Sequence, residues 1–216
     1  MTHSHTDHQS LPWLDAATLR QARYDGAELI DARPVERFAT GHIPGALSLA
    51  LRGHFGALLI TLITPETPVV FVLDEDQDRD ELARHCHDHG LQQLHGVLAG
   101  GMRAWHATGL PITTLPMLGV ADLGNQHVLD VRSQAEWQDG HLPHAAHVPL
   151  EELAEVAVTE QVTTLMCNHG QRSMTAASLL ARRRGTTEGL SVLRDSAHDW
   201  SGHTGCPLQH GTASPE

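Results

Sequence analysis

The chain has 216 residues, which fits one large domain or two domains of about 100 residues each. Its formal net charge of −12 argues against a general nucleic-acid or anionic-membrane surface, so we expect no nucleic-acid and no membrane partner. The chain has three cysteines, a small and odd number that does not fit a disulfide framework. The start MTHSHTDHQS lacks the basic and apolar segments of a signal peptide, so we expect a cytoplasmic protein.

Apolar or β-branched runs alternate with helical patterns along the chain. These runs are typical of buried strands: AELID (27–31), VVFVL (69–73), HVLDV (127–131) and TTLM (163–166). Helices are predicted at residues 34–40, 79–90, 133–139 and 173–185. Pro34 suits a first helical turn, and Gly90 and Gly185 suit C-terminal caps. Strands that alternate with helices indicate an α/β fold with a mainly parallel central sheet flanked by helices.

The same pattern occurs twice. LIDARPVERFATGHIPGA (29–46) matches LDVRSQAEWQDGHLPHAA (129–146), and the motifs D-x-R and G-H-x-P within these blocks recur 99 positions later. HGVLAGGMRAW (95–105) aligns in the same way with LSVLRDSAHDW (190–200). Several blocks in one order at nearly one offset predict two copies of a single domain. The predicted copies cover residues 11–110 and 115–205.

The stretch CNHGQRS, residues 167–173, follows one of the predicted strands and precedes a predicted helix. Sites in parallel sheets lie beyond the carboxyl ends of strands, and unpaired N–H groups at a helix start favour an anion such as the Cys167 thiolate. Arg172 adds a positive charge that can hold an oxyanion with two hydrogen bonds. Gly170 permits a positive φ, and Ser173 is predicted to cap the helix. The stretch therefore predicts an anion cradle around a nucleophilic sulfur.

With these residues in place, the chain resembles the rhodaneses, sulfurtransferases whose active-site loop reads C-x-x-G-x-R-[ST]. The motifs D-x-R, G-H-[IL]-P-x-A and, in the first copy, V-L-x-G-G followed by tryptophan are similar to theirs, and the resemblance runs from about residue 11 to 200. The second copy departs from the family where Arg194-Asp195-Ser196 replaces the glycine pair. That replacement predicts an altered geometry beside the loop.

The resemblance implies a mechanism without a cofactor. The Cys167 thiolate would take a sulfur atom from thiosulfate or glutathione persulfide, hold it as a persulfide and pass it to a thiol or cyanide. Asp130 and Arg132 would support the surroundings of the loop. The residues that would bind substrate are Asn168, His169, Gly170, Gln171, Arg172 and Ser173.

The first copy has different residues in the loop, since LDEDQDRD (73–80) replaces MCNHGQRS. Asp74 stands at the position of the cysteine and cannot form a persulfide, and Gln77 replaces the loop glycine, although Arg79 keeps the place of the arginine. The negative charges of the aspartate and glutamate side chains in this stretch disfavour the binding of an anionic donor. We therefore expect an inactive first domain that serves for support, partner docking or shaping of the second site.

Histidine clusters suggest a partner more than a metal. HSHTDH (3–8) is similar to the zinc-binding H-x-H-x-D-H of metallo-β-lactamase-fold enzymes, and tandem rhodanese-like domains follow such a domain in persulfide dioxygenase fusions. A zinc site needs three or four ligands on a rigid frame, so we predict no metal at HSHTDH, at RHCHDHG (84–90) or at HTGCPLQH (203–210), which is interpreted as tail. A persulfide dioxygenase or another sulfur-handling protein is the expected partner.

Two alternatives to a sulfurtransferase remain. Relatives of this fold that act on phosphate are cysteine-based phosphatases and arsenate reductases, whose cysteine and arginine are separated by five residues. Only four residues lie between Cys167 and Arg172, which predicts a tighter cradle. The other alternative is a non-catalytic sulfur-carrier or adaptor module, favoured by the altered first loop and opposed by the intact second one.

Overall fold

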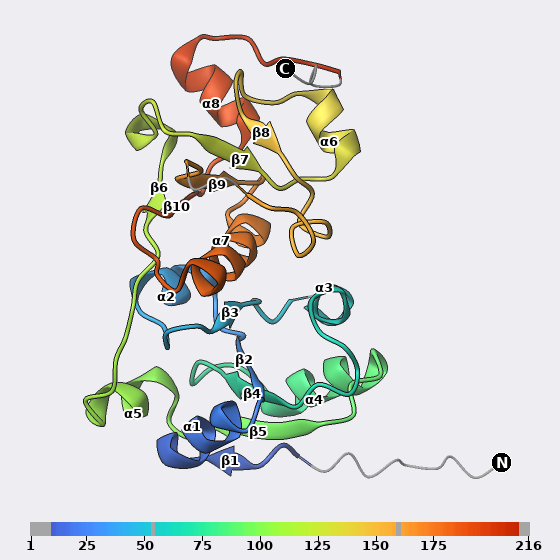
Figure 1. Ribbon diagram of the computed structural model, residues 1–216, viewed down its shortest axis with the longest axis vertical. Coiled ribbons are helices and arrows are strands. Elements are labelled where there is room, and N and C mark those ends of the chain that lie inside the picture. Colours follow the sequence, from blue (N-terminus) through green and yellow to red (C-terminus); the bar gives the residue numbers. More distant parts are fainter. Residues whose placement is uncertain (1–9, 53–54, 159–160, 212–216) are drawn as a thin grey trace, which may run out of the picture. The chain divides into compact units, whose positions relative to one another are not determined.

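The computed structural model describes residues 10–52, 55–158 and 161–211 (Figure 1). Its contacts divide the chain into two compact units. One unit comprises Leu49–Pro111 with the residues up to Arg33, and the other comprises Pro34–Ser48 with the residues from Ile112 onward. Across the described ranges, no helix is both long and apolar enough to cross a membrane.

The sheet of the first copy has the strand order β1-β5-β4-β2-β3. Pairing is parallel between β1 and β5, between β5 and β4, and between β4 and β2. Its strands are β1 (Trp13–Leu14), β2 (Glu28–Asp31), β3 (Leu47–Ser48), β4 (Val69–Val72) and β5 (Leu94–Leu98). The helices of this copy are α1 (Ala16–Tyr24), α2 (Val35–Thr40), α3 (Phe55–Leu62), α4 (Arg79–Asp88) and α5 (Gly101–Ala107).

The sheet of the second copy has the equivalent order β6-β10-β9-β7-β8, and every neighbouring pair is parallel. Its strands are β6 (Met117–Leu118), β7 (Val128–Asp130), β8 (Ala146–His147), β9 (Thr164–Met166) and β10 (Ser191–Leu193). The helical segments are η1 (Val120–Asp122), α6 (Gln134–Asp139), α7 (Gln171–Arg184) and α8 (Ala197–Thr204). One topology in two copies confirms the predicted repeat and the α/β fold.

The middle strand of each sheet positions the loop in which the predicted site residues, or their aligned counterparts, lie. β4 and β9 lie at the centre of their sheets, and every residue of both strands is buried. Continuous apolar runs of this kind are typical of parallel strands that are covered on both faces. The loops that follow β4 and β9 therefore begin at the centre of the carboxyl edge, where α/β folds place their sites.

Several predicted helix ends are shifted in the structure. Ser173 was expected to cap its helix, which is wrong: α7 begins at Gln171, and Gly170 is its N-cap residue. Pro34 is the N-cap of α2 and precedes its first turn. The predicted cap at Gly185 is confirmed, with a left-handed φ of 71°. Gly90 follows the C-cap residue of α4.

The segment HTGCPLQH, interpreted from sequence as tail, is part of the folded domain. Its first two residues end α8, and the backbone of Gln209 exchanges two hydrogen bonds of 2.9 Å with His141. Leu208 packs against a core cluster that includes Leu123 and Leu142. The prediction was wrong because glycine, proline and serine content is only a correlate of disorder, whereas one apolar residue and a backbone bridge suffice to dock a short segment.

Replacing Leu208 by alanine is expected to destabilise the second copy by about 1–2 kcal/mol, less than a fully buried leucine because this side chain is only partly buried. Urea unfolding followed by tryptophan fluorescence measures the change. The exposed neighbour His210→Ala is the matched control and should shift the midpoint by less than about 0.5 kcal/mol. Equal effects of the two substitutions would contradict docking through Leu208.

Candidate active site

Cys167 is the first residue after the central strand β9, and only 2% of its surface is exposed. The chain turns through residues 167–170 and enters α7 at Gln171. Gly170 makes this turn with φ at 77°, and a Cβ atom there would lie 2.9 Å from Cε of Met117. The Met117 side chain could move away from such a Cβ, but the positive φ would strain any residue with a side chain, so the turn favours glycine.

The first turn of α7 supplies hydrogen-bond donors to the loop. The first backbone bond across this turn runs from the Met174 N–H to the Gly170 carbonyl, at 2.9 Å. The N–H groups of Gln171, Arg172 and Ser173 precede it and have no carbonyl of their own helix to donate to. The Ser173 hydroxyl lies 3.3 Å from Sγ of Cys167, within hydrogen-bonding distance for sulfur. Backbone dipole and hydroxyl together favour an anion on this sulfur.

Arg172 is engaged by a carboxylate that sequence reasoning did not identify. Its Nη1 and Nη2 groups donate to the two oxygens of Glu136, each at 2.7 Å. These hydrogen bonds from Arg172 are the main reason that the pKa of Glu136 falls to about 2, and the same contact raises the pKa of Arg172. The guanidinium fork that was expected to be open to an oxyanion is thus paired end-on within the protein.

Glu136 also fixes the other end of the loop and its own helix. Oε1 accepts a hydrogen bond of 2.8 Å from Nδ2 of Asn168, the residue after the cysteine. Oε2 accepts from the backbone N–H of Ser133 at 3.0 Å, and Ser133 and Glu136 form a capping box at the start of α6. A signal was present in the sequence, because S-x-x-E marks such a box. Nothing local showed that this carboxylate also reaches the loop.

Asp130 and Arg132 form a buried ion pair beside the loop. Asp130 ends β7 and lies opposite Met166, the residue before the cysteine. Nη2 of Arg132 donates to Asp130 at 2.6 Å and to the Gly140 carbonyl at 2.8 Å, and both side chains are almost fully buried. The pair therefore ties the end of β7 to the turn that follows α6.

The remaining predicted loop residues lie away from the sulfur contacts. His169 is exposed. Two hydrogen bonds from Ser196 are the main causes that lower the pKa of Asp199, and the charge of His169 makes a smaller contribution in the same direction. Gln171 is partly exposed and accepts a hydrogen bond of 3.3 Å from Thr175 through its carbonyl. The structure thus joins Ser173 to the sulfur and joins Asn168 and Arg172 through Glu136, whereas the side chains of His169 and Gln171 take no part in these contacts.

The missing glycine pair changes how the last helix of the second copy begins. In the first copy Gly100 caps α5 with φ at 68°, and a Cβ on Gly101 would lie 2.9 Å from the Leu73 carbonyl. In the second copy Ser196 caps α8 from an extended conformation, through a capping box with Asp199. A serine cap therefore replaces the left-handed glycine cap.

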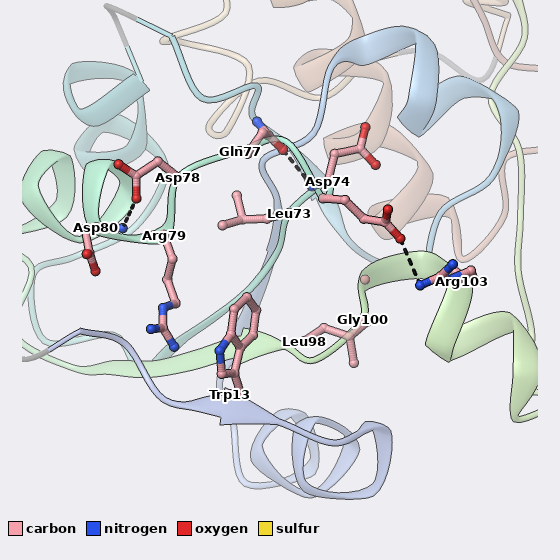
Figure 2. Close-up of a pocket in the computed structure, with 12 residues that line it drawn as sticks. Trp13, Leu73, Asp74, Gln77, Asp78, Arg79, Asp80, Leu98, Gly100 and Arg103 are labelled. Carbon is pink, nitrogen blue, oxygen red and sulfur yellow. Dashed lines mark hydrogen bonds and ion pairs between the residues drawn. The ribbon is translucent and has the colours of Figure 1, made fainter.

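The equivalent site of the first copy is a pocket of about 460 Å³ at the end of β4, shown in Figure 2. Asp74 takes the place of the cysteine, and its N–H donates to the Gln77 side chain at 2.8 Å. The Asp78 carboxylate accepts from the Asp80 N–H at 2.8 Å and caps α4, which begins one aligned residue later than α7. A protein carboxylate thus occupies the helix start that is left to an anion in the second copy.

The arginines of this pocket are also directed to partners inside the first copy. Arg79 donates to the Leu11 carbonyl at 2.6 Å. Its guanidinium also lies over the Trp13 ring (Figure 2), 4.5 Å from the ring centroid. Arg103 pairs with Glu75 at 3.1 Å. The positive charge that the aligned loop would offer to an anionic donor is therefore held beside the pocket wall and surrounded by acids.

The histidine clusters do not assemble into a ligand set in the part of the chain that the structure describes. HSHTDH lies outside the described residues. In α4, His85 pairs with Glu81 at 3.7 Å, and its carbonyl bonds the His89 ring at 2.9 Å. Cys86 is buried, and burial raises the pKa of its thiol to about 12. Among the described residues, no three His, Cys, Asp or Glu side chains meet as metal ligands.

The family model for the rhodanese-like domain matches residues 15–108 and 119–203. Among solved structures, a thiosulfate sulfurtransferase from Pseudomonas aeruginosa is 20% identical with a TM-score of 0.41; the alignment covers 94% of this chain and 44% of that one. This chain thus spans less than half of the Pseudomonas protein.

Two further solved structures are 3-mercaptopyruvate enzymes. A 3-mercaptopyruvate sulfotransferase from Escherichia coli is 16% identical with a TM-score of 0.42, and the alignment covers 85% of this chain and 98% of that one. A 3-mercaptopyruvate sulfurtransferase from Leishmania major is 14% identical with a TM-score of 0.39, covering 92% and 76%. None of the curated proteins matches the chain significantly.

Proposed function

The chain belongs to the rhodanese-like domain family, and on that premise we propose that its second copy is a sulfurtransferase that carries a sulfur atom on Cys167 as a persulfide. One observation carries the proposal: Cys167 lies buried at the end of the central strand, where α7 starts and the Ser173 hydroxyl is 3.3 Å from the sulfur. A thiolate is the reactive form of cysteine, and unpaired N–H groups at a helix start can stabilise an anion beside them.

The reaction is a double displacement. The Cys167 thiolate attacks the sulfane sulfur of a donor, the sulfur–sulfur bond of the donor breaks, and a persulfide anion remains on the cysteine. With thiosulfate the leaving group is sulfite, and with an organic persulfide it is the thiolate. An acceptor thiolate or cyanide then attacks the outer sulfur, which restores the Cys167 thiolate. The backbone N–H groups of Gln171, Arg172 and Ser173 would stabilise the anion at each stage.

We infer that the first copy transfers no sulfur. Asp74 is not a sulfur nucleophile, and the Asp78 carboxylate caps the helix start that would otherwise hold an anion. This copy is then a supporting or docking domain, for which a protein that produces or consumes persulfides is the proposed partner. In the second copy, Asp130 and Arg132 are assigned to supporting the loop.

The test is the intact mass of the protein after brief exposure to thiosulfate or to glutathione persulfide. We expect a gain of one sulfur atom per chain, removal of that atom by cyanide, and release of one equivalent of sulfite when thiosulfate is the donor. No gain with either donor would overturn the proposal. Hydrolysis of an aryl phosphate without any sulfur uptake would instead favour the phosphatase alternative.

A further inference from the structure

The charge around the cysteine is balanced by an acid that belongs to the protein. An arginine has five N–H donors, and Glu136 takes two of those of Arg172 in an end-on pair. The two side chains are 32% and 31% exposed, so the pair lies at the rim of the loop, within reach of dissolved anions. An incoming oxyanion therefore finds that one N–H of Nη1 and one of Nη2 are already engaged and that the guanidinium charge is already balanced by a carboxylate.

This arrangement treats donors of different charge differently. Thiosulfate is a dianion whose sulfonate oxygens would compete with Glu136 for Arg172, and it approaches a site that already holds this carboxylate and the Cys167 thiolate. An organic persulfide carries a single charge on its terminal sulfur and needs no sulfonate contact. Like charges a few ångströms apart in a partly buried site repel each other strongly. Glu136 is ionised at neutral pH, because the hydrogen bonds from Arg172 lower its pKa to about 2.

We propose that Glu136 is the positioning residue that sets donor preference in the second copy: by accepting from Nη1 and Nη2 of Arg172 it raises the KM for dianionic donors such as thiosulfate and makes organic persulfides the preferred donor class of this site. The proposal rests on the proposed sulfurtransferase function and specifies its substrate class. Sequence motifs of the loop alone point equally to both donors, because Glu136 lies 36 positions before Arg172.

Glu136→Gln separates charge from shape. Glutamine is as good as glutamate at the last position of a capping box, so α6 keeps its start. The amide has the same size and one oxygen acceptor, which preserves a contact to Asn168 or to Arg172. The matched control is Glu151→Gln, because Glu151 is exposed and raises the pKa of Arg172 only through its charge, after the larger effects of Glu136 and Cys167.

The experiment measures the rate of sulfur transfer to cyanide by the wild type, Glu136→Gln and Glu151→Gln. Each protein is tested with two donors: thiosulfate, and the persulfide of 2-mercaptoethanol, whose organic group carries no charge. For Glu136→Gln we expect kcat/KM with thiosulfate to rise about tenfold or more, through KM, because one charge-assisted pair no longer competes. With the persulfide we expect a change below about twofold. Glu151→Gln should change both donors by less than about twofold.

A parallel loss of activity with both donors would show a merely structural role and overturn the proposal. So would an equal rise in Glu151→Gln, which would reflect net charge, or an unchanged thiosulfate KM in Glu136→Gln.

Thiosulfate binding to the Cys167→Ser protein, with and without Glu136→Gln, is measured by calorimetry in parallel. It decides the role of Glu136 even if no donor transfers sulfur, an outcome that would overturn the proposed function alone. Tighter binding with Glu136→Gln is expected, and equal binding overturns the inference.

Discussion

Cys167→Ser is expected to take up no sulfur from thiosulfate or from an organic persulfide and to lose sulfur transfer by a factor on the order of 10³ or more. Serine is close in size to cysteine, and its hydroxyl can hydrogen-bond to Ser173, which lies 3.3 Å from the native sulfur. The fold should therefore survive. The hydroxyl is a far weaker nucleophile than a thiolate at neutral pH, and it forms no persulfide. Intact mass and the rate of thiocyanate formation measure the two losses.

The other two cysteines supply the controls for this experiment. Cys206 is exposed, so Cys206→Ser tests whether a surface thiol picks up sulfur nonspecifically. Cys86 is buried with a pKa raised to about 12, so it stays a protonated thiol. Both Cys206→Ser and wild type should gain one sulfur atom. Uptake that persists in Cys167→Ser and disappears in Cys206→Ser would contradict the assignment of the nucleophile.

Arg132→Met is expected to destabilise the second copy by about 3–5 kcal/mol, the largest stability effect that we predict. The substitution leaves the Asp130 carboxylate buried without its cation and leaves the Gly140 carbonyl without the 2.8 Å donor. A buried charge that loses its partner costs far more than the pair itself contributes. In urea unfolding the midpoint of the affected transition should fall by about 1–2 M.

Two further variants distinguish this effect from loss of positive charge in general. Arg103→Met breaks an ion pair whose side chains are 83% and 72% exposed, and it should cost no more than about 1 kcal/mol. In the first copy, Arg33→Met should be destabilising for the same reason as Arg132→Met, since Arg33 donates to the buried Asp31 carboxylate at 2.6 Å. If Arg132→Met and Arg103→Met shifted their transitions equally, the buried pair would not carry the stability assigned to it.

The local patterns of the sequence were sufficient for most of the fold. Blocks such as D-x-R and G-H-x-P recur at one offset, and apolar runs such as VVFVL can be satisfied only in the middle of a covered parallel sheet. Both properties are local or periodic, so they can be recognised in the sequence without knowing the tertiary contacts. The ends of helices were predicted less accurately. The start of α7, for example, depends on the left-handed turn at Gly170 more than on the capping preference of Ser173.

The candidate site divides in the same way. The sequence by itself predicted Cys167 as the nucleophile, placed it at a strand end and predicted a supporting role for Asp130 and Arg132, because each of these predictions rests on a short local motif. Only the tertiary structure showed that Glu136 fills the Arg172 fork, that the Asp78 carboxylate occupies the helix start of the first copy, and that Gln209 pairs with His141. The physical reason is that parallel strands bring their carboxyl ends to one edge, so that side chains far apart along the chain become neighbours whose charges no local pattern records.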